Sequence, residues 1–182
     1  MSYCQYVLAH PDDELNRIYH DAEYGYPVHD DDLLFERLVL EINQAGLSWA
    51  LILKKKENFN KAFHLFDLNK IAQFGEDDFS RLMNDKGIIR NRLKINAAIE
   101  NARIIKNIQN EVGSFKNWLD SHANHSLMEW VKLFKGTFLF TGEQIVGEFL
   151  ISTGYLSGAH DVNCPVYKKI QLLYPAWMDN SP

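Results

Sequence analysis

Four side chains with metal-binding chemistry lie near the two ends of the chain. His160 and Cys164 are four residues apart in the segment HDVNC, and on one helical turn this spacing places an imidazole beside a thiol. Cys4 and His20 share the N-terminal arm. Two cysteines and two histidines make the closed tetrahedral ligand set of structural zinc sites. The four residues therefore predict one structural Zn²⁺ that joins the N- and C-terminal segments.

The alternative is two unrelated buried thiols among scattered histidines. The chain has seven histidines, so some of them stand near a cysteine by chance. The histidines without ligand spacing are His10, His29, His64, His122 and His125. A disulfide between the two cysteines is not expected, because cytosolic thiols are kept reduced. Spacing alone leaves both interpretations open.

A second candidate is a carboxylate on the apolar face of a helix. Glu41 lies seven residues after Leu34, three after Leu38 and four before Ala45, so it shares their helical stripe. Burial of an ionised carboxylate without partners is very costly. Glu41 is therefore either an edge residue that reaches water or pairs with an arginine, or a carboxylate at the floor of a pocket.

The residues after Glu41 favour the pocket. The segment QAGLSW ends the helix at Gly46, and Ser48 is a good N-cap for the next helix. Trp49 is then the first residue of that helix, three positions after Gly46. The same segment thus combines a buried acid, a turn and a large aromatic side chain.

A basic hairpin is the third candidate. The segment FSRLMNDKGIIRNRLKINAAIENARIIKNI has the pattern of two helices joined by a tight turn at Gly87. Asn91 caps the second helix in this prediction, and that helix displays Arg92, Lys94 and Arg103. Free amides at a helix N-terminus suit a phosphate. Many αα-hairpins have this pattern, so a solvated basic helix face is the alternative.

The charge distribution agrees with an acidic face and a basic strip. The formal net charge of −5 argues weakly against a nucleic-acid partner. From residue 10 to 41, however, ten acids stand against two arginines, a net of −8. From residue 81 to 106, seven bases stand against two acids, a net of +5. The basic residues are therefore concentrated around the predicted hairpin.

The elements that must position these residues are nearly all helices. Helical periodicity predicts an all-α fold, and GTFLF at 136–140 is the one weak strand candidate. The predicted helices span 31–45, 48–56, 58–65, 76–84, 91–110, 114–122, 126–134 and 142–155. A length of 182 residues suits one domain, or two small lobes that share one core.

Composition bounds the class of protein. Hydrophobic residues at 46% and charged residues at 24% are ordinary for a soluble globular protein. No apolar run approaches the ~18 residues of a membrane span. No basic segment followed by an apolar one opens the chain, so we expect no signal peptide and a cytoplasmic protein.

Five segments together resemble the 3-methyladenine DNA glycosylase I family. They are an N-terminal cysteine, YHDAEYGYP, LFERLVLEINQAGLSWALILKKKENFNKAFHLFD, KGIIRNRLKI and HDVNC. The similarity runs from Cys4 to about Ala102 and resumes from near Gly142 to Cys164. It therefore covers most of the chain.

The resemblance implies a fold and an activity. It implies a helix-hairpin-helix DNA glycosylase fold, with 1–182 as a single glycosylase domain, the hairpin around 79–103 and the zinc site formed by both terminal segments. It implies monofunctional hydrolysis of the N-glycosidic bond of 3-methyladenine in double-stranded alkylated DNA after base flipping. It implies neither a membrane nor an obligate protein partner, and we expect a monomer.

The resemblance also assigns site residues. The family's zinc ligands fall on Cys4, His20, His160 and Cys164. The catalytic and base-recognition carboxylate falls on Glu41, and the hairpin has no lysine suited to a Schiff base, so we expect no lyase activity. The residues implied to contact the flipped base or its vacated place are Trp49, Tyr19, Tyr24, Glu41 and Leu47. Those implied to contact the DNA backbone are Lys86, Gly87, Arg90 and Arg92.

Several positions depart from the family pattern. A frequent pocket tyrosine aligns with Asn16, which removes one stacking face, and tyrosines replace common tryptophans at Tyr6 and Tyr24. The segment GEFLIST at 147–153 replaces an aromatic-Phe-Met-Gln-Ala run, and 125–136 is shorter than usual. The alternative function is a zinc-stabilised damage- or DNA-binding protein with lost or narrowed glycosylase activity. A helical scaffold that uses the acidic N-terminal arm as its interface is a third possibility.

Overall fold

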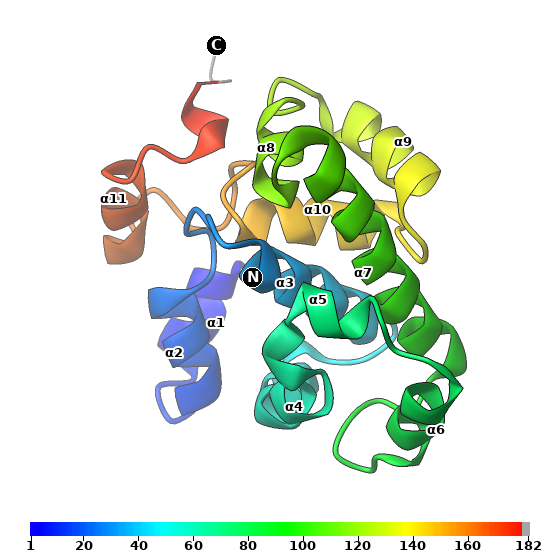
Figure 1. Cartoon of the computed structure of the whole chain (residues 1–182). Helices are drawn as coiled ribbons and strands as arrows, with labels where there is room; N and C mark the ends of the chain where they lie inside the picture. The colour runs from blue at the N-terminus through cyan, green and yellow to red at the C-terminus, as the bar shows by residue number, and fades with distance from the viewer. Residues whose placement is uncertain (180–182) are drawn as a thin grey trace.

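The protein is all-helical in the computed structural model, which describes residues 1–179 (Figure 1). The helices are α1 (Tyr3–Ala9), α2 (Glu14–Ala22), α3 (Asp31–Gln44), α4 (Trp49–Ala62), α5 (Leu68–Ile71), α6 (Glu76–Asn84), α7 (Arg92–Val112), α8 (Phe115–Asp120), α9 (Leu127–Thr137), α10 (Glu143–Ser152) and α11 (Pro165–Gln171). Two 3₁₀ turns, η1 (His64–Phe66) and η2 (Ala176–Met178), complete the described chain. The predicted fold class is confirmed, and no strand occurs within residues 1–179.

The weak strand candidate at 136–140 is wrong. Helix α9 starts at a capping box between Ser126 and Glu129 and continues through Thr137. Phe134 and Phe138, four residues apart, are both buried, so the aromatic residues follow a helical rather than an alternating period. Phe140 lies in the loop that leads to α10, with a positive φ of 60°.

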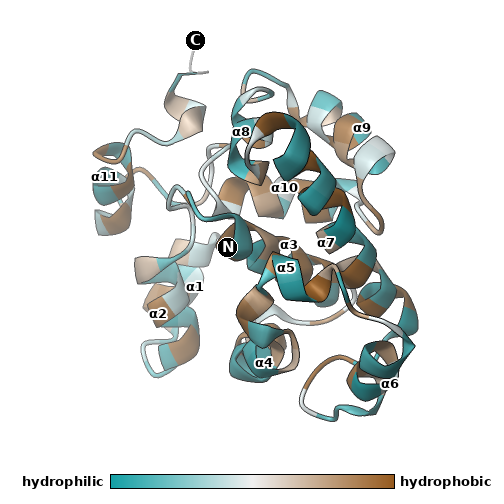
Figure 2. Ribbon diagram, viewed as in Figure 1, coloured by the Kyte–Doolittle hydropathy of each residue, from teal (hydrophilic) through white to brown (hydrophobic). Residues whose placement is uncertain are grey.

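Helix α3 carries Glu41 through the centre of the molecule. Every residue from Leu34 to Asn43 is buried, because α3 packs against α4, α7, α8 and α10. Figure 2 shows apolar residues along α3 and α10, with hydrophilic residues on the outer faces of α4, α5 and α7. A side chain on any face of α3 between Leu34 and Asn43 therefore enters protein rather than water.

Side-chain caps fix where the central helices begin. Asp30 accepts a hydrogen bond from the Leu33 amide at 3.0 Å and opens α3, and Ser48 accepts one from the Leu51 amide at 3.3 Å and opens α4. Between the two helices, Gly46 has a φ of 78°, which favours glycine. Helix α4 joins the helix predicted at 48–56 to most of the one predicted at 58–65, since the residue between them is Glu57, a good helix former. It ends at Ala62, before the 3₁₀ turn η1.

The N-terminal helices lie beside the segment around α11 on one side of the fold. In Figure 1 the N-terminal pair α1 and α2 lies beside α11, at a distance from α6 and the hairpin. Cys4, Cys164, Val166 and Ile170 form a small buried cluster there, separate from the main core. Helices α1, α2, α5 and α11 have at most nine residues each and few buried positions, so periodicity did not predict them.

Residues 85–91 join α6 to α7 as a tight turn whose interior is anchored in the core. Ile88 is buried, and Lys55 Nζ donates to the Gly87 carbonyl at 2.8 Å and to the Lys86 carbonyl at 3.2 Å. A Cβ on Gly87 would lie 2.9 Å from Asp85 Oδ1 and 3.2 Å from the Asn58 side chain. Glycine is required because these groups approach so closely.

No helix within residues 1–179 is both long and apolar enough to cross a membrane.

Candidate functional site

A pocket of about 570 Å³ opens beside the C-terminal part of α3. Aromatic rings and carboxylates dominate its walls, and neither lysine nor arginine is among its lining residues. The lining residues are Tyr3, Tyr19, Tyr24, Glu41, Gln44, Trp49, Leu127, Glu143, Gln144, Gly147, Glu148 and Ile151. The pocket therefore suits a flat, positively charged ligand.

Glu41 lies deep in this pocket, with only 4% of its surface exposed. It is not at the wet edge of its helix. Arg37, one turn earlier on α3, directs its guanidinium elsewhere, donating to the Tyr19 hydroxyl at 2.8 Å and to Glu23 at 3.3 Å. Among residues 1–179, no side chain forms a hydrogen bond or ion pair with the Glu41 carboxylate.

Burial raises the pKa of Glu41 from its ordinary value of 4.5 to about 8. The positive charge of Arg37 lowers this pKa, and the negative charge of Glu148 raises it further. The carboxyl group is thus mostly protonated at neutral pH and half ionised near pH 8. A positively charged ligand in the pocket would favour the ionised form.

Three rings pack around the carboxylate. The Tyr19 ring is 5.0 Å from the Trp49 ring and 5.7 Å from the Tyr24 ring, measured between centroids. The Trp49 Nε1 atom is buried and has no hydrogen-bond partner within residues 1–179. Its N–H still lowers the burial-raised pKa of Tyr3, so it lies near that hydroxyl without meeting hydrogen-bond geometry.

Helix α10 forms the opposite wall and supplies residues that sequence reasoning missed. Glu143, Gln144, Gly147, Glu148 and Ile151 recur at helical spacing and all line the pocket. The Tyr24 hydroxyl donates to Glu148 Oε2 at 3.3 Å. The departure at 147–153 therefore brings a carboxylate to the pocket mouth and a glycine to its wall, and the spacing along α10 was the available signal.

The loop residue Leu47 does not line the pocket. It lies between α3 and α4 with 36% of its surface exposed. The predicted hairpin side chains Lys86, Arg90 and Arg92 are exposed at the other candidate surface. The Arg92 guanidinium lies 4.9 Å over the Phe79 ring, which fixes its stem on α6.

Of the basic residues predicted on the surface of α7, Lys94 is not displayed. Lys94 is buried, and its Nζ donates to the carbonyls of Asn43 at 2.9 Å and Ala45 at 2.7 Å. It caps the C-terminal end of α3, where carbonyls lack helical partners. Arg103 donates to the carbonyls of Ala72 and Phe74 at 3.1 Å and 2.6 Å. Lys94 is therefore used internally, whereas the Arg103 side chain stays 43% exposed while it holds these carbonyls.

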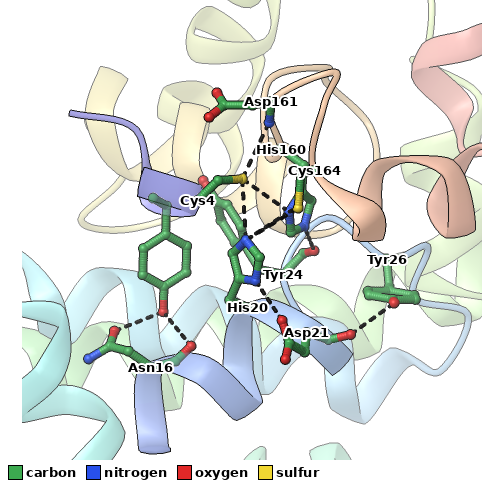
Figure 3. Close-up of polar contacts among 10 residues, drawn as sticks. Cys4, Asn16, His20, Asp21, Tyr24, Tyr26, His160, Asp161 and Cys164 are labelled. Atoms are coloured by element: carbon green, nitrogen blue, oxygen red, sulfur yellow. Dashed lines mark hydrogen bonds and ion pairs between the residues drawn. The ribbon is translucent and has the colours of Figure 1, made fainter. Parts of the chain in front are cut away.

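Cys4, His20, His160 and Cys164 form one buried cluster, although the first and last are 160 positions apart (Figure 3). His20 Nε2 lies 3.2 Å from Cys4 Sγ, 3.2 Å from His160 Nδ1 and 3.8 Å from Cys164 Sγ. His160 Nδ1 lies 3.6 Å from Cys4 Sγ and 3.7 Å from Cys164 Sγ. Tetrahedral zinc with its usual bond lengths places such atoms ~3.3–3.8 Å apart. The cluster is therefore consistent with a metal site.

The second ring nitrogens of both histidines have partners. His20 Nδ1 lies 2.8 Å from Asp21 Oδ1, and His160 Nε2 lies 2.8 Å from the Tyr24 carbonyl (Figure 3). Such outer contacts fix the tautomer that presents the other nitrogen to a metal. The Asp161 amide also donates to Cys4 Sγ at 3.3 Å, as amides do near metal-bound thiolates.

The prediction that His160 and Cys164 share one helical turn is wrong. The two residues lie in the loop before α11, where the Cys164 amide donates to the Asp161 carbonyl at 2.8 Å. Cys164 is the N-cap of α11, and Pro165 follows it. Proline disfavours helical conformation in the residue before it, so the pair meets through a turn instead.

The cluster and the pocket share a wall. Tyr3 precedes Cys4, and Tyr19 precedes His20 in the chain. The Tyr24 carbonyl faces His160 Nε2. Two of the pocket tyrosines are therefore chain neighbours of cluster residues, and the backbone of the third contacts a cluster histidine.

Comparison with known proteins places this pocket in context. The model of the methyladenine glycosylase family matches residues 9–135. DNA-3-methyladenine glycosylase 1 of Escherichia coli K12 is 44% identical over 125 residues, which cover 69% of this chain and 65% of that protein. DNA-3-methyladenine glycosylase of Haemophilus influenzae is 41% identical over 107 residues, or 59% of this chain and 58% of that protein. The matched part thus spans less than two thirds of either relative's length.

Solved structures are similar over more of the chain. A tyrosine-to-phenylalanine variant of 3-methyladenine DNA glycosylase I in complex with 3-methyladenine superposes with a TM-score of 0.79 at 32% identity, over 84% of this chain and 92% of that chain. A glutamate-to-glutamine variant from Staphylococcus aureus gives a TM-score of 0.81 at 32% identity, over 91% and 97%. A further Staphylococcus aureus structure, which describes 3-methyladenine recognition, gives 0.77 at 33% identity, over 84% and 91%.

Proposed function

Because this chain belongs to the methyladenine glycosylase family, we propose that it is a monofunctional DNA-3-methyladenine glycosylase. In this proposal it hydrolyses the N-glycosidic bond of 3-methyladenine in double-stranded alkylated DNA, the first step of base-excision repair. The observation that carries the proposal is the buried Glu41 carboxylate in a pocket walled by aromatic rings. The two curated relatives at 44% and 41% identity carry the same activity in their names.

The pocket chemistry fits a flipped cationic base. A base inside a duplex is out of reach of such a pocket, so it must first rotate out of the stack. The 3-methyladenine base carries a positive charge, which the Glu41 carboxylate attracts. The carboxylate also accepts hydrogen bonds from the edge of the base. Trp49 and Tyr19 offer π-faces, and a cation over an aromatic ring gains ~0.5–2 kcal/mol. Neutral adenine gains much less from either interaction.

Hydrolysis then needs little acid catalysis. Water forms a bond to C1′ of the sugar as the bond from C1′ to the base breaks, and a proton leaves to solvent. The departing base keeps the bonding electrons, which neutralise its positive charge. Glu41 stabilises the charge that develops near the bond, as preorganised charges do in water-excluded sites.

Water rather than an amine is the proposed nucleophile. Lys94 is bonded to two carbonyls and Lys55 to the hairpin carbonyls, so neither amine is free to form a Schiff base. The proposal therefore includes no lyase step. It also requires no partner protein, and it assigns a monomer that acts on DNA in the bacterial cytoplasm.

We propose that the hairpin holds the DNA backbone. Lys86, Arg90 and Arg92 are exposed bases around the turn at Gly87 and the N-terminus of α7, which suits a phosphate. Gly87 is proposed to let the backbone of the turn approach the DNA. Leu47 is proposed to enter the duplex where the base leaves, because it is apolar, exposed and six residues after Glu41.

The double substitution Arg90→Ala with Arg92→Ala is expected to weaken DNA binding. Log affinity falls as log salt rises, and each phosphate contact that is lost should make this slope less steep by ~1. The slope of the double variant should therefore be shallower by ~2. Affinity titrations at several salt concentrations measure this slope. Lys168→Ala with Lys169→Ala is the matched control, since it removes the same charge from α11, which lies far from the hairpin (Figure 1). Equal slopes in both variants would contradict the proposed backbone contact.

The rate constant kcat/KM is expected to rise with pH and to level off above about pH 8, the pKa of Glu41 in the free protein. Only the ionised carboxylate attracts a cationic base. Glu148→Gln should move this midpoint to lower pH, because Glu148 raises the Glu41 pKa by charge repulsion. Excision rates from pH 5 to 9 test both points. A flat profile would show that ionisation of Glu41 is not needed.

We propose that the cluster of Cys4, His20, His160 and Cys164 binds one structural Zn²⁺. The support is its Cys2His2 composition, its burial and its interatomic distances. All four positions are used by protein ligands, so the ion would have no open position for catalysis. Its proposed role is to hold α1 and α2 against the loop before α11.

A further inference from the structure

One wall of the pocket comes from a residue outside the family match. Tyr3 lies on α1, before the matched residues 9–135, and it lines the pocket. Its ring centroid is 5.2 Å from that of Tyr24 and 6.2 Å from that of Tyr19. The ring therefore extends the aromatic wall that surrounds Glu41.

A buried amide holds the Tyr3 ring in this place. The Tyr3 hydroxyl donates to Asn16 Oδ1 at 2.8 Å and lies 3.2 Å from the Asn16 carbonyl. The Asn16 residue is only 3% exposed. Figure 3 draws these two contacts between the tyrosine hydroxyl and Asn16. The hydroxyl proton is thus committed to Asn16, and the pocket receives the ring.

The orientation of the Asn16 amide is fixed from its other side. Asn16 Nδ2 donates to Asp13 Oδ2 at 2.8 Å, and the Asn16 backbone amide donates to Asp13 Oδ1 at 3.3 Å. A carboxylate only accepts hydrogen bonds, so it selects the rotamer that turns Nδ2 toward itself. Oδ1 then faces Tyr3 as an acceptor.

We propose that Tyr3 is a base-contacting residue of the pocket and that Asn16 is its positioning residue. The ligand that the ring would meet is a flat, positively charged methylated purine. This inference rests on the proposed glycosylase function. It also gives Asn16 a different role. The sequence suggested that Asn16 removes a stacking face, whereas in this proposal it anchors a ring supplied by another helix.

Four variants test the inference by the dissociation constant for free 3-methyladenine, with kcat and KM for its release from methylated DNA. In Tyr3→Ala and Tyr3→Leu, the dissociation constant and KM are expected to rise about tenfold, the usual loss for one stacking aromatic. Tyr3→Phe keeps the ring but loses the bond to Asn16, so both constants should rise by at most about threefold, as in Asn16→Ala. Leu8→Ala is the control, because Leu8 shares α1, is exposed and does not line the pocket.

The positioning role of Asn16 needs a double-mutant cycle. Asn16→Ala should weaken base binding in the wild-type background but much less in Tyr3→Phe, which has no hydroxyl to hold. Metal content and thermal unfolding are measured for each variant, because Tyr3 neighbours Cys4. Tyr3→Leu keeps apolar bulk on α1, so it separates loss of the ring from loss of the fold.

Different failures are distinguishable. If wild-type protein releases 3-methyladenine, and Tyr3→Leu with intact metal matches it in KM and base affinity, the Tyr3 assignment is refuted and the glycosylase function stands. Equal effects of Asn16→Ala in both backgrounds would refute the positioning role. A wild-type protein that neither binds nor releases 3-methyladenine would refute the proposed function and this inference together.

Discussion

Glu41→Gln is expected to lower the rate of 3-methyladenine release by about 100-fold or more, the usual loss when one preorganised electrostatic group is removed from such a site. Glutamine keeps the shape of the side chain but not its charge. The aromatic walls would still accept a flat base, so base binding should fall less than the rate. Single-turnover release of 3-methyladenine from methylated duplex DNA measures the effect.

The same substitution is expected to stabilise the fold at pH 8. The pKa of Glu41 in the folded protein, about 8, lies above its ordinary value of 4.5, so the buried group binds a proton that the unfolded chain releases. The free-energy cost of ionising the buried Glu41 is absent below about pH 4.5, grows as the pH rises and is complete above about pH 8. Glutamine has no charge at any of these pH values, so the variant has no such cost. Urea unfolding of both proteins at several pH values should therefore diverge as pH rises.

Glu36→Gln is the matched control for both measurements. Glu36 lies on the same helix, but it pairs with Lys56 at 3.4 Å and does not line the pocket. This variant should retain excision and should not be stabilised at high pH. An unfolded Glu41→Gln protein would show that Glu41 holds the structure together instead, and an active one would remove it from the mechanism.

Cys164→Ser is expected to lose the metal and to destabilise the protein strongly. Structural zinc sites contribute folding free energy directly, and the loss of one ligand should cost at least ~3 kcal/mol, or ~6–12 °C in Tm for a chain of this size. The cluster joins segments 160 positions apart, so the unfolded chain gains much freedom without it. Elemental analysis and thermal unfolding measure the two effects.

Activity should fall together with metal content in this variant, because Tyr3, Tyr19 and Tyr24 are tied to the cluster. His29→Ala is the control, since His29 is exposed and lies outside the cluster. Wild-type protein should contain about one equivalent of zinc per chain. A metal-free protein with unchanged thermal stability would contradict the four-ligand site.

The sequence predicted the central helix and the residues that it carries toward the pocket. Asp30 and Ser48 are strong local caps, and the apolar stripe through Leu34 and Leu38 gave Glu41 its inward direction. The four-residue cluster was also predictable, because ligand chemistry limits the choice to few residue types. Caps, apolar stripes and ligand types can all be read from the sequence before the packing of distant segments is known.

Other features depend on tertiary contacts that no local pattern encodes. Lys94 has the spacing of a displayed base, yet it is drawn inward by two carbonyls that end α3. Tyr3 precedes the recognisable motifs, and its place depends on Asn16 in another helix. Glu148 reaches the pocket only because α10 packs against α3.

The identity of the base released from methylated duplex DNA tests the central claim most directly. Purified protein is incubated with the DNA, and the freed bases are separated by chromatography, with Glu41→Gln in parallel. The account predicts that wild-type protein releases 3-methyladenine and that Glu41→Gln does not. Release of no base by a protein that still binds the DNA would contradict it, and would mean that this pocket recognises damage without removing it.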